Sequence, residues 1–274
     1  NYAAEIIACG GSAEQKPDAK SDKDCARLNL AKPDFGWTLE PFGDFDTGRL
    51  MGDYIYMPDG KVFIVNGAGR GFAGWASLPQ KIPLLYDPKA PLGSRFTRMA
   101  EAKIIRVYHS TATLIPDGTV FVAGSNPNPE YCGNSSCEYP TEYRVEIFEP
   151  AYLFKGIPRP IIKSIKGIET FNSLTSIQVK YGEAITITMD LNDSAANITA
   201  ALIHPGFVTH SLHMSSRYVS LQTKNQVPIP SGYSVDVILP PHPNIMPPGR
   251  HTYIFILNKG TPANTAIEID LKRS

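Results

Sequence analysis

The sequence has no excess of either charge and no long apolar run. Its 274 residues contain 26 basic and 26 acidic side chains, so the formal net charge is zero. A protein that binds nucleic acid or an anionic membrane through charge needs a basic surface, and this balance gives no sign of one. No stretch approaches the roughly 18 consecutive apolar residues of a membrane-spanning helix. We therefore expect no nucleic acid partner and no membrane span.

Helical periodicity and a signal peptide are also lacking. The first residues, NYAAE, show no charged start followed by an apolar run, so we interpret the chain as a mature or trimmed product. Glycine (22) and proline (24) make up about one residue in six, where roughly 12% is usual. This high content of glycine and proline favours many short strands joined by turns over a helical bundle. The 42% of hydrophobic residues is enough to bury a core.

The four cysteines form two local groups. Cys9 and Cys25 bracket a polar segment, and Cys132 and Cys137 bracket the residues GNSS. Four cysteines allow three pairings, among which the sequence alone cannot choose. Pairing within each group is the simplest arrangement, because each disulfide bond then closes one exposed loop. The alternative is a zinc site, which no Cys-x-x-Cys motif or nearby histidine supports.

Three acceptor sequences for N-glycosylation begin at Asn134, Asn192 and Asn197. One such match is common by chance. Three of them, in a glycine- and proline-rich chain with an even number of cysteines, indicate a secreted, extracellular glycoprotein with disulfide bonds.

A repeat of 57 or 58 residues occupies the first half. Residues 57–67 (MPDGKVFIVNG) match residues 115–124 (IPDGTVFVAG), and residues 5–11 (EIIACGG) form a third, partial copy. The unit reads as a strand, a Pro-Asp-Gly turn and an apolar strand that ends at glycine. With the strand candidates that follow, it is typical of a blade of a kelch-type β-propeller. The alternative is a generic β-sandwich with chance Pro-Asp-Gly turns.

The pattern changes near residue 155. Eight strand candidates between residues 177 and 270 have the spacing of an immunoglobulin-like sandwich, with clear alternation over residues 252–257 (TYIFIL). We therefore predict an all-β protein. Residues 1–154 would form part of a propeller, and residues 155–274 would form an immunoglobulin-like β-sandwich.

Two segments with histidine are candidates for chemistry. Tyr108 and His109 stand at the start of a strand, where both side chains can reach one site only if the backbone bends. His210 lies in residues 206–214 (GFVTHSLHM), where a period of two groups it with apolar residues and puts His213 on the solvent side. If this stretch is a loop, His210 projects from its tip. For both segments the alternative is an ordinary packing role.

The strings RVYHS (106–110), LIPDG (114–118) and AGSNP (123–127) resemble the copper radical oxidases, and within them glyoxal oxidase more than galactose oxidase. Residues 66–73, 143–148 and 205–211 agree as well. The resemblance implies a seven-bladed kelch propeller followed by an immunoglobulin-like domain. It implies copper bound by Tyr108, His109 and His210, which suits the donor set of Cu(II), with Tyr108 taking the proton of the substrate. Arg70, Phe72 and Trp75 would line the substrate pocket, or else form an ordinary blade loop.

One part of the family pattern has no counterpart here. The family's radical tyrosine, linked to a cysteine, belongs to a part of the propeller that precedes this sequence, and neither Trp37 nor Trp75 matches the tryptophan that stacks on it. Fewer than three blades also leave sheet edges exposed. We therefore expect a partner, the N-terminal portion of the propeller, as a separate chain or a missing segment that supplies the Cys-Tyr radical cofactor.

The resemblance thus implies a secreted copper oxidase. Its substrates would be small aldehydes of the glyoxal or methylglyoxal type, or primary alcohols, with O2 as acceptor and H2O2 as product. The alternative is a non-enzymatic extracellular module, for structure or adhesion, that keeps the propeller and the sandwich without a working radical site.

Overall fold

The computed structural model describes residues 4–32, 34, 36–41, 48–133, 136–169 and 176–272. In these ranges nearly all the regular structure is β-strand, and two short 3-10 helices, η2 (Ala73–Trp75) and η3 (Ala151–Phe154), are the exceptions. The prediction of an all-β protein is confirmed. No helix in the described part of the chain combines the length and apolar character needed to cross a bilayer.

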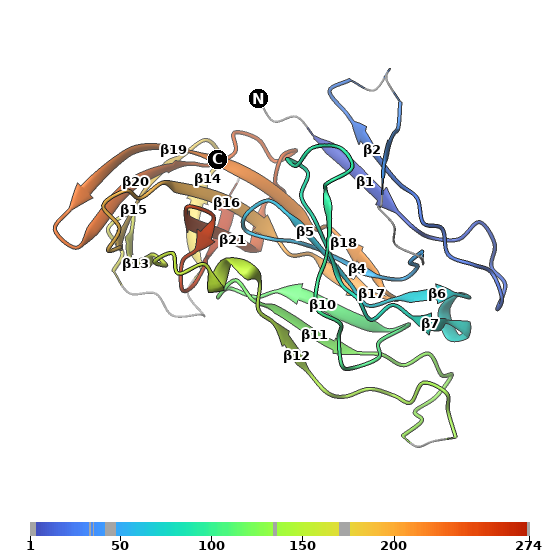
Figure 1. The fold of residues 1–274 in the computed structure, drawn as a ribbon. Coiled ribbons are helices and arrows are strands. Elements are labelled where there is room, and N and C mark those ends of the chain that lie inside the picture. The colour runs from blue at the N-terminus through green and yellow to red at the C-terminus, as the bar shows by residue number, and fades with distance from the viewer. Residues whose placement is uncertain are drawn as a thin grey trace.

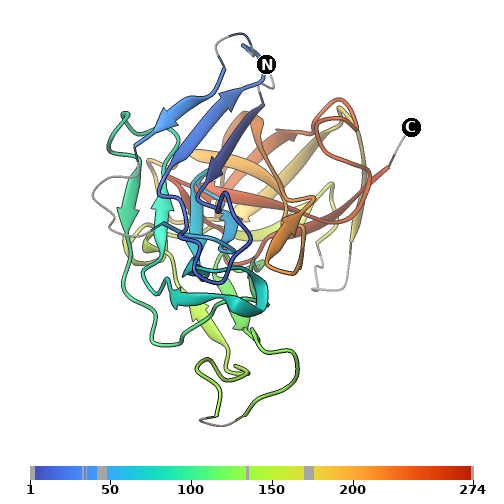
Figure 2. The ribbon, with the colours of Figure 1, turned by 90° about the vertical axis from the view of Figure 1, so that its right-hand side faces the viewer.

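The first half of the chain forms three small antiparallel sheets that follow one another around one side of the molecule (Figures 1 and 2). The first contains β1 (Glu5–Cys9), β2 (Cys25–Asn29) and β3 (Thr38–Glu40). The second contains β4 (Asp53–Tyr56), β5 (Val62–Val65), β8 (Leu84–Tyr86) and β9 (Phe96–Arg98). The third contains β10 (Ser110–Leu114), β11 (Val120–Gly124) and β12 (Glu146–Phe148). We call these sheets the first, second and third blade. A ribbon of β6 (Ala68–Arg70) and β7 (Ser77–Pro79) lies between β5 and β8 in the chain.

The sequence repeat is also a repeat of backbone geometry. In both Pro-Asp-Gly turns, the residue before proline accepts a hydrogen bond from the glycine N–H and donates its own N–H to the carbonyl four residues on, at 2.8–3.0 Å. Gly60 and Gly118 have φ of 86° and 88°, a left-handed conformation that glycine adopts without steric cost. The turns therefore set the same register between β4 and β5 as between β10 and β11.

The second half of the chain forms a curled sheet of nine strands that folds into two layers. The strands are β13 (Ile161–Ile165), β14 (Ile177–Lys180), β15 (Ala184–Asp190), β16 (Ile198–His204), β19 (Arg217–Ile229), β20 (Gly232–Ile238), β21 (Gly249–Asn258), β22 (Thr261–Pro262) and β23 (Ile267–Lys272). β19 connects the layers, because its first residues pair with β16 and its later residues pair with β20. This arrangement confirms the predicted sandwich.

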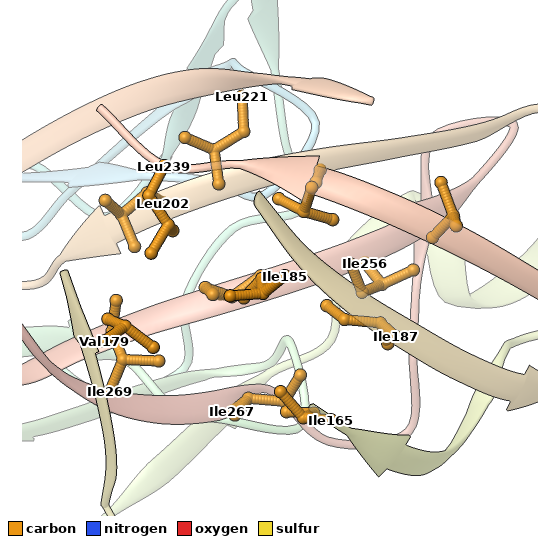
Figure 3. Packing of buried hydrophobic residues seen from close by; sticks show 14 of the residues in the cluster. Ile165, Val179, Ile185, Ile187, Leu202, Leu221, Leu239, Ile256, Ile267 and Ile269 are labelled. Atoms are coloured by element: carbon orange, nitrogen blue, oxygen red, sulfur yellow. The ribbon is translucent and has the colours of Figure 1, made fainter. Parts of the chain in front are cut away.

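The interior of the sandwich is filled by aliphatic side chains from both layers (Figure 3). Along β15, alternate residues are buried, so Ile185 and Ile187 face the interior while their neighbours are more exposed. They meet residues such as Leu202, Ile256 and Ile267 from the opposite layer. Each fully buried side chain of this size contributes about 1.5–3 kcal/mol, which makes this core the main source of stability in the second half.

A second core joins the blades to the sandwich. Met57 and Phe63 of the second blade pack in one cluster with Ile203 and Phe255 of the sandwich. Phe63 also stacks on Phe148 of the third blade, with ring centroids 4.0 Å apart and planes at 13°. Since one apolar core serves blades and sandwich, packing holds the two parts of the chain together.

All four cysteines are bonded in the local pairs predicted, Cys9 with Cys25 and Cys132 with Cys137. The first bond joins β1 to β2 at directly opposite residues. The second closes a short loop after the third blade's β11. No free thiol remains, which excludes a cysteine-based zinc site in this chain.

Candidate metal centre

Tyr108 and His109 are the two residues immediately before β10. His109 has a φ of 60°, so the backbone bends sharply there and the alternation of an extended strand does not apply. The two neighbouring rings consequently lie together, with centroids 3.9 Å apart and planes at 28°. The bend is what brings an adjacent tyrosine and histidine to one place.

Backbone and side-chain hydrogen bonds hold this pair. The buried guanidinium of Arg106 donates to the carbonyl of Gly124 at 2.8 Å. The N–H of Asn126 donates to the carbonyl of Tyr108 at 2.9 Å. The carbonyl of Asn126 lies 3.0 Å from Nδ1 of His109. With Nδ1 bonded to a carbonyl, Nε2 is the nitrogen of His109 that can bind a metal.

His210 lies at the tip of a hairpin that leaves the sandwich. The hairpin consists of β17 (Phe207–Thr209) and β18 (Leu212–Met214). His210 and Ser211 connect these strands with φ of 52° and 59°, the positive values that a two-residue type I′ turn requires at both positions. Since neither residue is glycine, the turn is strained, and such strain is concentrated at functional sites.

The hairpin brings His210 to the Tyr108–His109 pair. The centroid of its ring lies 5.4 Å from that of His109 and 6.4 Å from that of Tyr108. Oγ1 of Thr209 lies 2.7 Å from Nδ1 of His210. As at His109, the hydrogen bond at Nδ1 leaves Nε2 for a metal.

The spacing of the two imidazole rings is compatible with one copper ion. Imidazole nitrogens bind first-row ions at about 2 Å, so the centroids of two rings on one ion lie at most roughly 6.5 Å apart. The separation of His109 and His210 meets this condition. Two imidazoles with oxygen donors suit tetragonal Cu(II). In the described ranges no group of three or more His, Cys, Asp or Glu side chains offers a different metal site.

The prediction that His213 faces solvent is wrong. Its side chain is only 8% exposed, and Nε2 lies 2.7 Å from Oδ1 of the fully buried Asp53. Leu212 and Met214, expected on the buried side, are more than 45% exposed. The assumption of strand alternation over residues 206–214 failed because the chain reverses after His210. Residues on either side of the turn therefore do not belong to one strand. Attraction to a buried carboxylate then turns His213 toward β4.

Comparisons with known proteins decide the family. Residues 1–152 match the model of the glyoxal oxidase N-terminus, and residues 168–268 match the galactose oxidase-like early set domain. The chain belongs to the glyoxal oxidase family. The predicted resemblance to the copper radical oxidases is therefore confirmed.

Relatives of the glyoxal oxidase family align with nearly all of this chain. Aldehyde oxidase GLOX1 of Arabidopsis thaliana is 36% identical over 95% of the chain and 43% of its own length. Aldehyde oxidase GLOX of Vitis pseudoreticulata is also 36% identical, over 95% of the chain and 49% of its own length. A fungal alcohol oxidase of the AA5 family, solved in complex with copper, superimposes with a TM-score of 0.78 at 26% identity, over 98% of this chain and 51% of that one. The chain thus spans about half the length of these relatives.

The segment with Arg70, Phe72 and Trp75 lies beside Tyr108 in this member of the glyoxal oxidase family. Ala68 and Ala76, which flank it, are in one buried cluster on which Tyr108 packs. Trp75 is 62% exposed, Phe72 is half-buried, and Arg70 ends β6. The segment therefore lies near the cluster on which Tyr108 packs, and its own large side chains are not part of a buried core.

The sequence analysis missed two residues that contact the segments of the candidate centre. Asn126 lies in the AGSNP string, but nothing local marks its carbonyl as a partner of His109. Asp53 could have been recognised from the sequence, because alternation along β4 puts it on the same buried face as Ile55. A carboxylate at a buried strand position needs a partner, and that partner lies far away in the sequence.

Proposed function

We propose that this chain is the copper-binding C-terminal part of an oxidase that acts on small aldehydes or primary alcohols. In the reaction a hydrated aldehyde and O2 give a carboxylic acid and H2O2, or a primary alcohol and O2 give an aldehyde and H2O2. The observation that supports the proposal most directly is the convergence of Tyr108, His109 and His210 from two distant segments. Bound copper would supply the one-electron redox chemistry.

The histidines hold the metal and the tyrosine handles a proton. Nδ1 of His109 lies at hydrogen-bond distance from the carbonyl of Asn126, and Nδ1 of His210 from Oγ1 of Thr209, so that Nε2 of each ring would be the atom that binds copper. Tyr108 would offer its phenolic oxygen as third ligand. The same oxygen would accept the proton of the substrate hydroxyl, which is general base catalysis.

We assign the substrate pocket to the loop that follows β6. Its position beside Tyr108 supports this assignment, and the exposed ring of Trp75 offers an apolar wall. Phe72 and Arg70 would complete the wall and its polar edge. A pocket of this kind suits a small molecule with one carbonyl or hydroxyl group.

We propose that the radical tyrosine and its cysteine come from an N-terminal portion of the propeller, as a separate chain or a missing segment. All four cysteines here are in disulfides, so none is available for a thioether bond. Phe207 and Leu212 on the His210 hairpin are 61% and 58% exposed. Further blades packed around the hairpin would cover these side chains.

We also propose that the protein is secreted and glycosylated, and that its domains are residues 1–154 and 155–274. The two disulfides support an oxidising compartment. Asn192 and Asn197 are exposed, as acceptor sites must be, while Asn134 lies outside the described residues. The proposed boundary follows η3, ahead of the first sandwich strand.

A copper titration tests the proposal. The purified chain should bind one Cu(II) with a tetragonal EPR spectrum and nitrogen hyperfine coupling. His210→Ala should weaken binding by a hundredfold or more, whereas His242→Ala, in an exposed loop, should leave it unchanged. With the N-terminal portion added, glyoxal or methylglyoxal should yield peroxide. A chain that binds no Cu(II) would contradict the proposal and favour the structural or adhesive module.

A further inference from the structure

We infer that Asp53 is a positioning residue that sets the distance between His109 and His210, because its one buried carboxylate holds the segments that carry both histidines. The inference rests on the proposed copper function for its purpose. The contacts on which it depends exist in the chain without any metal.

The carboxylate of Asp53 is a junction of hydrogen bonds. Asp53 begins β4 and is fully buried. Oδ1 accepts a hydrogen bond from Nε2 of His213 at 2.7 Å. Oδ2 accepts one from Nδ2 of Asn66 at 2.8 Å, and Oγ of Ser110 lies 3.5 Å away.

Two of these partners are close neighbours of the proposed ligands. Ser110 directly follows His109 at the start of β10. His213 lies opposite Val208 in the hairpin register, three residues after His210 and across the turn from it. A shift of the carboxylate would therefore affect both histidine segments.

Among the residues that the structure describes, the bond to His213 is the sole polar attachment of the hairpin to the blades. Among the described residues, no other hydrogen bond or ion pair joins residues 207–214 to the three blades. The apolar side chains of the hairpin give it only a small attachment, because Phe207, Leu212 and Met214 are exposed and Val208 is half-buried. Without the bond, only packing, such as that around the buried Ser211, would hold the strained two-residue turn that carries His210.

The buried pair of Asp53 and His213 is a poor arrangement if its only role is to stabilise the fold. A buried carboxylate and imidazole lose hydration, and this loss offsets much of their attraction. Nδ1 of His213 is buried and has no hydrogen-bond partner among the described residues, which costs further stability. In the third blade the position five residues before the proline is Thr111 rather than aspartate. The carboxylate is thus not a general requirement of the blade.

The experiment compares variants of the full chain for copper binding and for hydrogen exchange of the hairpin amides. Asp53→Asn and His213→Ala should weaken Cu(II) binding at least tenfold and broaden the EPR spectrum. Without copper, both should speed exchange of the amides of residues 207–214 at least tenfold. His213→Gln, which keeps a side-chain N–H for the carboxylate, should restore both properties to within about threefold.

Two controls separate positioning from loss of stability. Asp193→Asn removes a carboxylate that pairs with Lys259 in the sandwich, and it should lower stability without altering copper binding. His251→Ala removes an exposed imidazole 3.6 Å from Glu268 and should change nothing. If Asp53→Asn and His213→Ala behave like Asp193→Asn in both measurements, the inference is overturned. If the wild-type chain binds no copper, the proposed function fails, and the exchange data alone decide whether Asp53 holds the hairpin.

Discussion

The second and third blades have the same backbone and differ in what they present at its bend. Met51 and His109 each lie seven residues before the proline of the Pro-Asp-Gly turn, with φ of 54° and 60°. Met51 packs in the same apolar cluster as Tyr108, whereas the imidazole of His109 faces His210. The left-handed bend therefore belongs to the blade, and the chemistry depends on the side chain placed on it.

A buried arginine supports the bend in both blades. Arg49 donates to the carbonyl of Asn66, and Arg106 donates to the carbonyl of Gly124. Both acceptors lie eight residues after the proline of their turn. Burial lowers the pKa of Arg49 to about 10, so its guanidinium remains charged at neutral pH. The left-handed bend and the arginine that supports it thus occur in both blades, whereas the proposed ligands Tyr108 and His109 occur only in the third.

The largest expected difference between the blades concerns a phenylalanine they share. Phe63 and Phe121 both lie five residues after the proline, but Phe63 is fully buried in the shared core and Phe121 is half-buried. Phe63→Ala should lower the free energy of unfolding by about 3–5 kcal/mol, and Phe121→Ala by about half as much. Urea unfolding measures both losses. Equal losses would mean that the blades are packed alike, contrary to the shared core.

The two disulfides should differ by their loop lengths. The Cys9–Cys25 bond spans 16 residues and the Cys132–Cys137 bond spans five. Constraint of the unfolded chain predicts losses of about 3 and about 2 kcal/mol when each pair is replaced by alanine. Thermal unfolding of the two double variants tests the order. A larger loss at the shorter loop would show that native contacts of that loop, and not chain entropy, determine the effect.

The second and third blades also show which features of the fold and of the candidate site could be predicted from the sequence. The blades were predictable because the Pro-Asp-Gly turn is local chemistry that repeats at a regular spacing. Tyr108, His109 and His210 were proposed as ligands through a family resemblance, and the bends that bring their rings together lie in backbone angles that no periodicity reveals. His213 was misplaced because a turn interrupted the count. Its partner, Asp53, lies 160 residues away in the sequence, and only the packed fold brings the two together.

His109→Met tests whether scaffold and chemistry are separable. Methionine already occupies the equivalent bend at Met51, and His109 is exposed, so the free energy of unfolding should change by less than about 0.5 kcal/mol. Copper affinity should nevertheless fall about a hundredfold, equivalent to about 2.8 kcal/mol. The two quantities come from urea unfolding and Cu(II) titration, with Met51→Leu as the matched control. A large loss of stability would mean that the imidazole itself maintains the bend.

The smallest expected effects concern the turn glycines, which touch the sandwich differently in the two blades. A Cβ at Gly118 would lie 2.9 Å from the ring of Pro262, and one at Gly60 would lie 3.1 Å from the hydroxyl of Tyr218. Gly93 has a similar φ of 88° and no neighbour within 4 Å, so Gly93→Ala measures backbone strain alone, about 1–2 kcal/mol.

Of the three glycine variants, Gly118→Ala should lower the free energy of unfolding most, because the ring of Pro262 is rigid. Gly60→Ala should fall near Gly93→Ala, because the end of a tyrosine side chain can move aside. Urea unfolding of the three variants ranks them. If Gly60→Ala costs as much as Gly118→Ala, Tyr218 is held as firmly as Pro262, and both turns are rigid contacts between the blades and the sandwich from which the His210 hairpin extends.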